Sequence, residues 1–144
     1  MSPQELDQFA RQGYTRVPVV REVLADLDTP LSAYRKLASG PYTYLFESVQ
    51  GGERWGRYSI IGLPATEVVR ITGQQVQVDG PDGRQQEDVA DPIAWVEDYR
   101  QAYRSPDLPG LPRFNGGLVG YFGYDSVRFF EPRLGPAPGE DVLG

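Results

Sequence analysis

The stretch Tyr42–Leu63, YTYLFESVQGGERWGRYSIIGL, decides the fold predicted for this chain. Apolar and aromatic residues fill both of its arms, and Gly51-Gly52 between them can adopt the positive backbone angles of a tight hairpin turn. We therefore predict two antiparallel strands. Glu47 and Ser48 interrupt the first arm near its end, and polar groups in a buried strand are costly to desolvate unless something pairs with them. This pair is a candidate binding site.

Capped helices and further strands flank the hairpin. Ser2, Thr29 and Asp91 each precede a proline and then apolar residues at helical spacing, which predicts three helix N-termini. Strands are expected over Thr15–Val23, Thr66–Thr72, Gln75–Val78 and Gly117–Tyr124, and a short helix capped by Asp125 is expected after them. Because no βαβ units alternate along the chain, the pattern indicates an α+β fold, with a mainly antiparallel sheet and helices on one face.

Composition bounds the function. The chain has 144 residues, 40% of them hydrophobic, which suits one globular unit. Its net charge of -6 opposes binding to the phosphates of nucleic acids. No apolar run approaches the roughly 20 residues of a membrane span, and the N-terminus lacks the regions of a signal peptide. We expect a cytoplasmic protein with neither nucleic acid nor membrane as partner.

The absent residue types bear on catalysis. With no cysteine and no histidine, the chain has no thiol nucleophile, thiolate metal site or imidazole base. A carboxylate pair or the single lysine, Lys36, could act in principle, but Lys36 falls on the predicted solvent side of a helix. We expect no catalytic residue in this chain and no resident metal.

The composition changes near the end of the chain. From Pro132 onward it is rich in proline and glycine and has no periodicity. We therefore predict a domain over residues 1–131 and a linker over 132–144 that leads toward a further domain. An ordinary frayed terminus is the alternative.

Two stretches carry a resemblance to a known family. LFESVQGGERWGRYSIIG, from Leu45 to Gly62, and FNGGLVGYFGYDSVRFFE, from Phe114 to Glu131, resemble the signature stretches of the N-terminal domain of anthranilate synthase component I. The order of predicted elements fits as well, so the resemblance covers nearly the whole chain. The related domain of aminodeoxychorismate synthase component I is the alternative within the same class.

The resemblance implies a regulatory role. The family makes anthranilate from chorismate and ammonia, with Mg²⁺, in a C-terminal chorismate-binding domain, and a glutamine amidotransferase subunit supplies the ammonia. The N-terminal domain is similar to a regulatory element whose leucine-leucine-glutamate-serine motif forms part of the L-tryptophan feedback site. That motif corresponds here to Leu45, Phe46, Glu47 and Ser48, with phenylalanine in place of the second leucine.

The motif suits an amino-acid effector. Tryptophan presents an ammonium group, a carboxylate and an indole ring, which require a carboxylate, hydroxyl or backbone donors, and an apolar slot. We expect Ser48 to contact the ligand, and Glu47 either to reach the ammonium group or to pair with Arg57 across the hairpin. Two other classes stay open: a stand-alone ligand-binding module, and a scaffold in which the Gly117–Tyr124 strand and the preceding proline-rich loop dock another domain.

Overall fold

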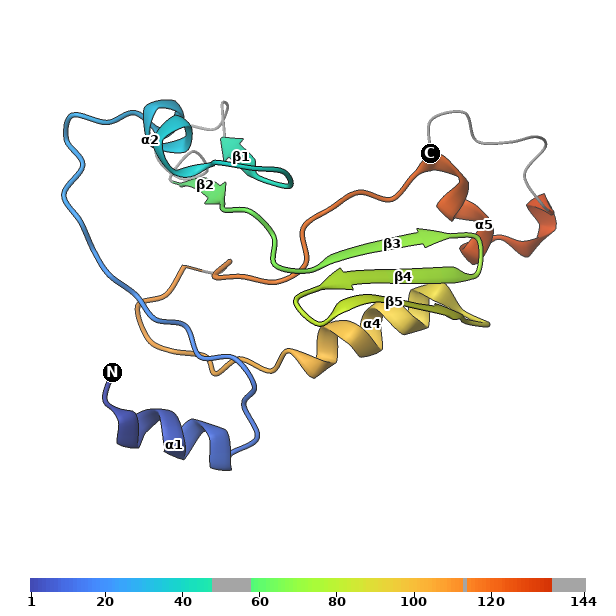
Figure 1. Ribbon diagram of the computed structural model, residues 1–144, viewed down its shortest axis with the longest axis horizontal. Helices are drawn as coiled ribbons and strands as arrows, with labels where there is room; N and C mark the ends of the chain where they lie inside the picture. Colours follow the sequence, from blue (N-terminus) through green and yellow to red (C-terminus); the bar gives the residue numbers. More distant parts are fainter. Residues whose placement is uncertain (48–57, 113, 136–144) are drawn as a thin grey trace. The chain divides into compact units, whose positions relative to one another are not determined.

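Four α-helices and two small sheets make up the described part of the chain (Figure 1). The computed structural model describes residues 1–47, 58–112 and 114–135. In chain order the elements are α1 (Pro3–Arg11), α2 (Pro30–Leu37), β1 (Tyr44–Glu47), β2 (Ser59–Gly62), β3 (Val68–Thr72), β4 (Gln75–Gly80), β5 (Gly83–Asp88), α4 (Pro92–Ala102), the 3₁₀ turn η1 (Tyr124–Ser126), α5 (Val127–Phe130) and the 3₁₀ turn η2 (Pro132–Leu134). The predicted α+β class is confirmed. The strands form two sheets, of order β1-β2 and β3-β4-β5.

Contacts within the chain divide it into two compact units. One holds Met1–Val20, Ile71–Val76 and the chain from Asp88 onward, and the other holds Arg21–Arg70 and Gln77–Glu87. The expected bounds, a domain over 1–131 and a linker over 132–144, stay a prediction.

The helices begin where local chemistry predicts. At α1, the Ser2 hydroxyl accepts from the backbone N–H of Glu5, whose carboxylate accepts from the backbone N–H of Ser2 at 2.6 Å. Thr29 and Ser32 make the same reciprocal pair at α2. At α4, one carboxylate oxygen of Asp91 accepts two backbone N–H groups at 3.0 Å. Each cap satisfies N–H groups that the first helical turn leaves unpaired, so these predictions are confirmed.

Two-residue turns build the three-stranded sheet. Gly73, at a φ of +59°, opens the turn between β3 and β4, and Gly83, at a φ of +99°, begins β5. Connections this short join antiparallel neighbours. On β4, Val76 is only 1% exposed. All six residues of β5 are exposed, and the sequence did not predict this strand.

The strand predicted over Thr15–Val23 is wrong. The backbone N–H groups of Thr15 and Arg16 both donate to the carbonyl of Arg104, at 2.9 and 3.0 Å, just after α4. The Thr15 hydroxyl also donates to the Ala102 carbonyl at 2.7 Å. The segment therefore hydrogen-bonds to the end of a helix and not to a sheet, and Pro18 has no N–H with which to extend a ladder.

Two further predictions fail near the C-terminal end of the described chain. Gly117–Tyr124 forms no strand: Gly116 and Gly117 have φ values of +141° and +135°, outside the range of a strand. Asp125 does not cap α5, which has no side-chain cap. Its carboxylate instead pairs with the Arg128 guanidinium at 2.8 Å.

Candidate functional site

The β1–β2 hairpin carries the predicted effector motif. Its antiparallel register pairs Tyr44 with Gly62, Leu45 with Ile61, Phe46 with Ile60 and Glu47 with Ser59. Successive side chains of a strand alternate between the two faces of the sheet. Leu45 and Glu47 therefore share one face, and Tyr44 and Phe46 share the other.

The described motif residues differ in exposure. Leu45 is half-buried, Phe46 is 52% exposed and Glu47 is exposed. Ser48, the residue expected to contact the ligand, and Arg57, the alternative partner of Glu47, lie outside the described residues. Ligand contact by Leu45, Phe46, Glu47 and Ser48 stays a prediction.

A close contact between Tyr44 and Gly62 fixes this register. The ring of Tyr44 lies so near the Gly62 backbone that a Cβ atom at Gly62 would come within 2.0 Å of the Tyr44 Cε1 atom. Gly62 is buried, and the rings of Tyr44 and Phe46 lie 4.8 Å apart on their common face. The Tyr44 ring thus lies over β2 at Gly62, the one residue of that strand that has no side chain.

Helix α2 supports the hairpin, with contacts to both β1 and β2. The Tyr34 and Thr43 hydroxyls are hydrogen-bonded at 2.8 Å, which connects the helix to the residue before β1. Lys36 is exposed, as predicted, and its ammonium group bonds the Asp28 carboxylate at 2.7 Å. The hydrogen bond from Lys36, with a second from Ser32, lowers the pKa of Asp28. The single lysine therefore has a partner at the start of α2.

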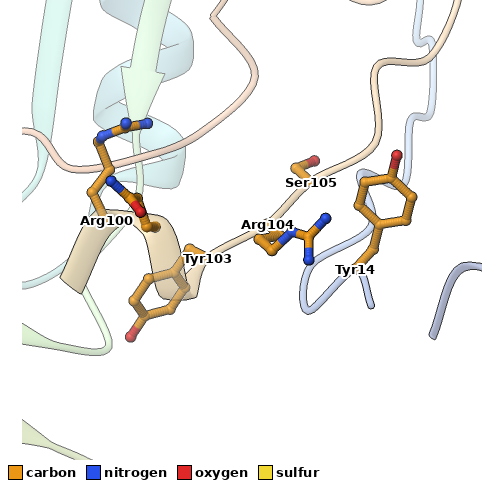
Figure 2. A pocket seen from close by; sticks show the side chains of 6 residues that line it. Tyr14, Arg100, Tyr103, Arg104 and Ser105 are labelled. Carbon is orange, nitrogen blue, oxygen red and sulfur yellow. The ribbon is translucent and has the colours of Figure 1, made fainter. Parts of the chain in front are cut away.

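A hollow lies at the end of α4 (Figure 2). It is an open hollow of about 560 Å³, lined by Tyr14, Arg100, Gln101, Tyr103, Arg104 and Ser105. The Arg104 guanidinium lies 5.9 Å from the centre of the Tyr14 ring. Sequence reasoning missed this hollow, because its lining combines Tyr14, near the start of the chain, with the last turn of α4 and the residues that follow it. Arg100 lies in the last turn of α4, and Arg104 lies two residues beyond the end of that helix.

Arg100 is already engaged on its own helix. Its guanidinium donates to both carboxylate oxygens of Glu97, at 2.8 and 2.6 Å. This bidentate bond, with a further one from Gln101, lowers the pKa of Glu97 to about 2. One of the two arginines of the hollow is therefore neutralised.

Within residues 1–47, 58–112 and 114–135, no His, Cys, Asp or Glu side chains gather in groups of three or more that could hold a metal ion. None of the helices there has the length and apolar character needed to cross a membrane.

The fold and site define an α+β chain whose candidate site is a hairpin bearing an aliphatic, an aromatic and a carboxylate side chain. Comparison with curated proteins shows what it is similar to. Anthranilate synthase component 1 of Pseudomonas putida is 56% identical over 146 aligned positions, which cover 100% of this chain and 29% of that protein. The Pseudomonas aeruginosa protein of the same name is also 56% identical, over 100% of this chain and 30% of its own length. The Neisseria meningitidis serogroup B protein of that name is 50% identical over 91% of this chain.

The chain is a homologue of the N-terminal portion of anthranilate synthase component 1, as its two signature stretches predicted. It spans about three tenths of the length of these relatives. No family model and no solved structure matches the chain.

The Tyr44–Gly62 contact generates a stability prediction. Gly62→Ala should lower the free energy of unfolding by about 1–3 kcal/mol, because the added methyl group overlaps the Tyr44 ring and one of them must move. Chemical denaturation followed by tryptophan fluorescence measures this. The matched control is Gly120→Ala, where a Cβ atom meets nothing within 4 Å and no change or a slight gain is expected. Equal stability of the two variants would refute the close contact.

The Glu97–Arg100 pair generates a pH prediction. Because the folded-state pKa of Glu97 lies below its ordinary value of 4.5, the pair contributes stability above pH 4.5 that is lost as the pH falls toward about 2. Carbon-detected NMR should place the Glu97 titration midpoint near 2, and Arg100→Gln should raise it. Gln101→Ala, which removes the smaller contribution, should raise it less. A midpoint of about 4.5 in the parent chain would contradict the bidentate geometry.

Proposed function

We propose that this chain is the N-terminal regulatory part of an anthranilate synthase component 1, and that it contributes half of an L-tryptophan feedback site. The observation that carries the proposal is the 56% identity to two proteins of that name over the whole chain. In the proposed enzyme a C-terminal chorismate-binding domain makes anthranilate from chorismate and ammonia, and a glutamine amidotransferase subunit supplies the ammonia. The cytoplasm is the expected compartment.

The hairpin offers the groups that tryptophan requires. The exposed carboxylate of Glu47 suits the ligand's ammonium group, and the half-exposed ring of Phe46 offers apolar surface on the other face. Ser48 follows directly in the sequence and is proposed to contact the ligand. The second half of the site is proposed to come from the C-terminal domain.

Catalysis is assigned to that other domain. Mg²⁺ is proposed to bind there as well; within the described residues of this chain no group of three potential ligands gathers, and the Asp28, Asp79 and Asp125 carboxylates pair with cationic side chains. Feedback then acts through coupling. If tryptophan binds better to an inactive arrangement of the two domains, it shifts the enzyme away from the productive one by that difference in affinity.

One observation supports docking as a second role. The segment predicted as a strand from Gly117 to Tyr124 exposes three aromatic side chains, Tyr121, Phe122 and Tyr124, with exposed fractions of 86%, 71% and 92%. Exposed apolar surface of this kind is typical of interaction sites. It is compatible with a regulatory part that docks on a further domain, and equally with a scaffold that binds no effector.

Replacing the aligned segment of the Pseudomonas putida protein with this chain tests the regulatory proposal. The hybrid should form anthranilate from chorismate and ammonia, measured by anthranilate fluorescence, and L-tryptophan should inhibit it. Ser48→Phe should raise the half-inhibiting tryptophan concentration about 100-fold, because the phenylalanine ring fills the proposed pocket. Allosteric coupling between two sites is commonly of this size. The values of kcat and KM for chorismate should not change.

The matched control is Ser39→Phe, at an exposed serine of the same unit that is not part of β1 or β2, which should leave inhibition unchanged. Normal inhibition of the Ser48→Phe hybrid would overturn the assignment of Ser48. An active hybrid that tryptophan does not inhibit would favour the scaffold.

The chain alone should respond differently from the hybrid. Because only half of the site is present, we expect no rise in Tm on addition of millimolar L-tryptophan and no consumption of chorismate. A ligand that binds the folded state stabilises it by mass action, so a Tm rise of several degrees, absent with D-tryptophan, would show that this half suffices. That result would support a stand-alone ligand-binding module.

A further inference from the structure

A left-handed backbone conformation precedes the effector strand. Tyr42 has a φ of +58°, and among the described residues it is the one non-glycine residue with a positive φ. For a residue with a bulky side chain this conformation is unfavourable and persists only where its surroundings hold it. Tyr42 lies two residues before β1, so its backbone angles set the direction in which the chain enters that strand.

Arg70 on β3 holds the Tyr42 side chain in two ways. Its Nη2 donates to the Tyr42 hydroxyl, and its Cζ lies 5.6 Å from the centre of the Tyr42 ring. A guanidinium at this distance from an aromatic ring is attracted to its π face. The same guanidinium thus bonds the hydroxyl of Tyr42 and lies within cation–π distance of its ring.

Asp79 on β4 fixes Arg70 from the other side. Its Oδ2 accepts from Arg70 Nη1 at 2.5 Å, and its Oδ1 accepts from Arg84 Nε at 2.6 Å. The bond from Arg84 is the largest cause of the lowered pKa of Asp79, which keeps the carboxylate charged. Gln77 Nε2 adds a further bond at 2.9 Å. The carboxylate is therefore anchored even without Arg70.

We propose that Tyr42, Arg70 and Asp79 are positioning residues that fix the entry of β1 into its hairpin and thereby set the affinity of the effector half-site. This inference rests on the proposed function. A change of one residue in strand register turns every side chain to the opposite face, so the placement of Leu45 and Glu47 depends on how the chain leaves Tyr42. All three positioning residues belong to the same compact unit as the hairpin.

Two arginines on one carboxylate provide a matched pair of variants. Arg70→Gln and Arg84→Gln each remove one ion pair with Asp79, but only Arg70 is bonded to Tyr42. Both arginine side chains are partly exposed, at 45% and 64%, so neither variant should prevent folding. A difference between them reports the contact with Tyr42 and not the loss of charge.

Hydrogen exchange in the 144-residue chain tests the positioning without any ligand. Arg70→Gln should speed exchange of the Tyr44–Glu47 amides by about tenfold, since local opening becomes easier, whereas Arg84→Gln should change it by less than about twofold. Tyr42→Phe, which keeps the ring and removes the hydroxyl, should give an intermediate increase. Equal exchange of these amides in the two arginine variants would overturn the positioning role, whatever the chain binds.

The hybrid enzyme tests the link to the effector. Arg70→Gln should raise the half-inhibiting tryptophan concentration about five- to tenfold with kcat and KM for chorismate unchanged, and Arg84→Gln should leave inhibition as in the parent. Faster exchange with unchanged inhibition would overturn the effect on affinity. A parent hybrid that tryptophan does not inhibit would instead refute the proposed function, and hydrogen exchange would still decide whether Tyr42, Arg70 and Asp79 position β1.

Discussion

The pairing of Tyr44 with Gly62 is the constraint on which the hairpin depends. Backbone hydrogen bonds alone would allow β1 and β2 to pair in more than one register, because every residue offers the same donor and acceptor. Only one register places the Tyr44 ring over a residue without a side chain, and the 2.0 Å approach of a hypothetical Cβ shows that the space is filled. The faces on which Leu45, Phe46 and Glu47 lie follow from that register.

Sequence reasoning succeeded where structure follows from local chemistry. The starts of α1, α2 and α4 were predicted because each cap uses a side chain within three residues of the N–H group that it satisfies. It failed where structure depends on a distant partner. Valines between Thr15 and Val23 suit a strand, yet the backbone there bonds to the carbonyl of Arg104. Strand β5 was missed for the opposite reason, since GRQQED has no apolar residue and pairs through its backbone.

The same contrast between local and distant interactions applies to the candidate site. The motif Leu45–Ser48 could be identified from sequence, because its residue types stand next to one another and resemble a known signature. The contact between Tyr42 and Arg70 could not, because the two residues are 28 positions apart and neither belongs to a motif. Residue propensities also do not predict a tyrosine in the left-handed backbone conformation, because they favour glycine or asparagine there. Residues far apart in the sequence come into contact only in the folded chain, so a sequence motif does not reveal such a contact.

The distribution of charge suggests how the effector half-site would work. Asp28, Asp79, Glu97 and Asp125 each form an ion pair, whereas Glu47 forms none within the described part of the chain. The exposed Glu47 carboxylate is stabilised by water, and covering it with another domain would remove that hydration at a large free-energy cost. An ammonium group bound beside Glu47 would offset that cost at the moment of closure. Under the proposed function, tryptophan would therefore favour the closed arrangement because its ammonium group brings positive charge to Glu47, which is the difference in affinity that feedback requires.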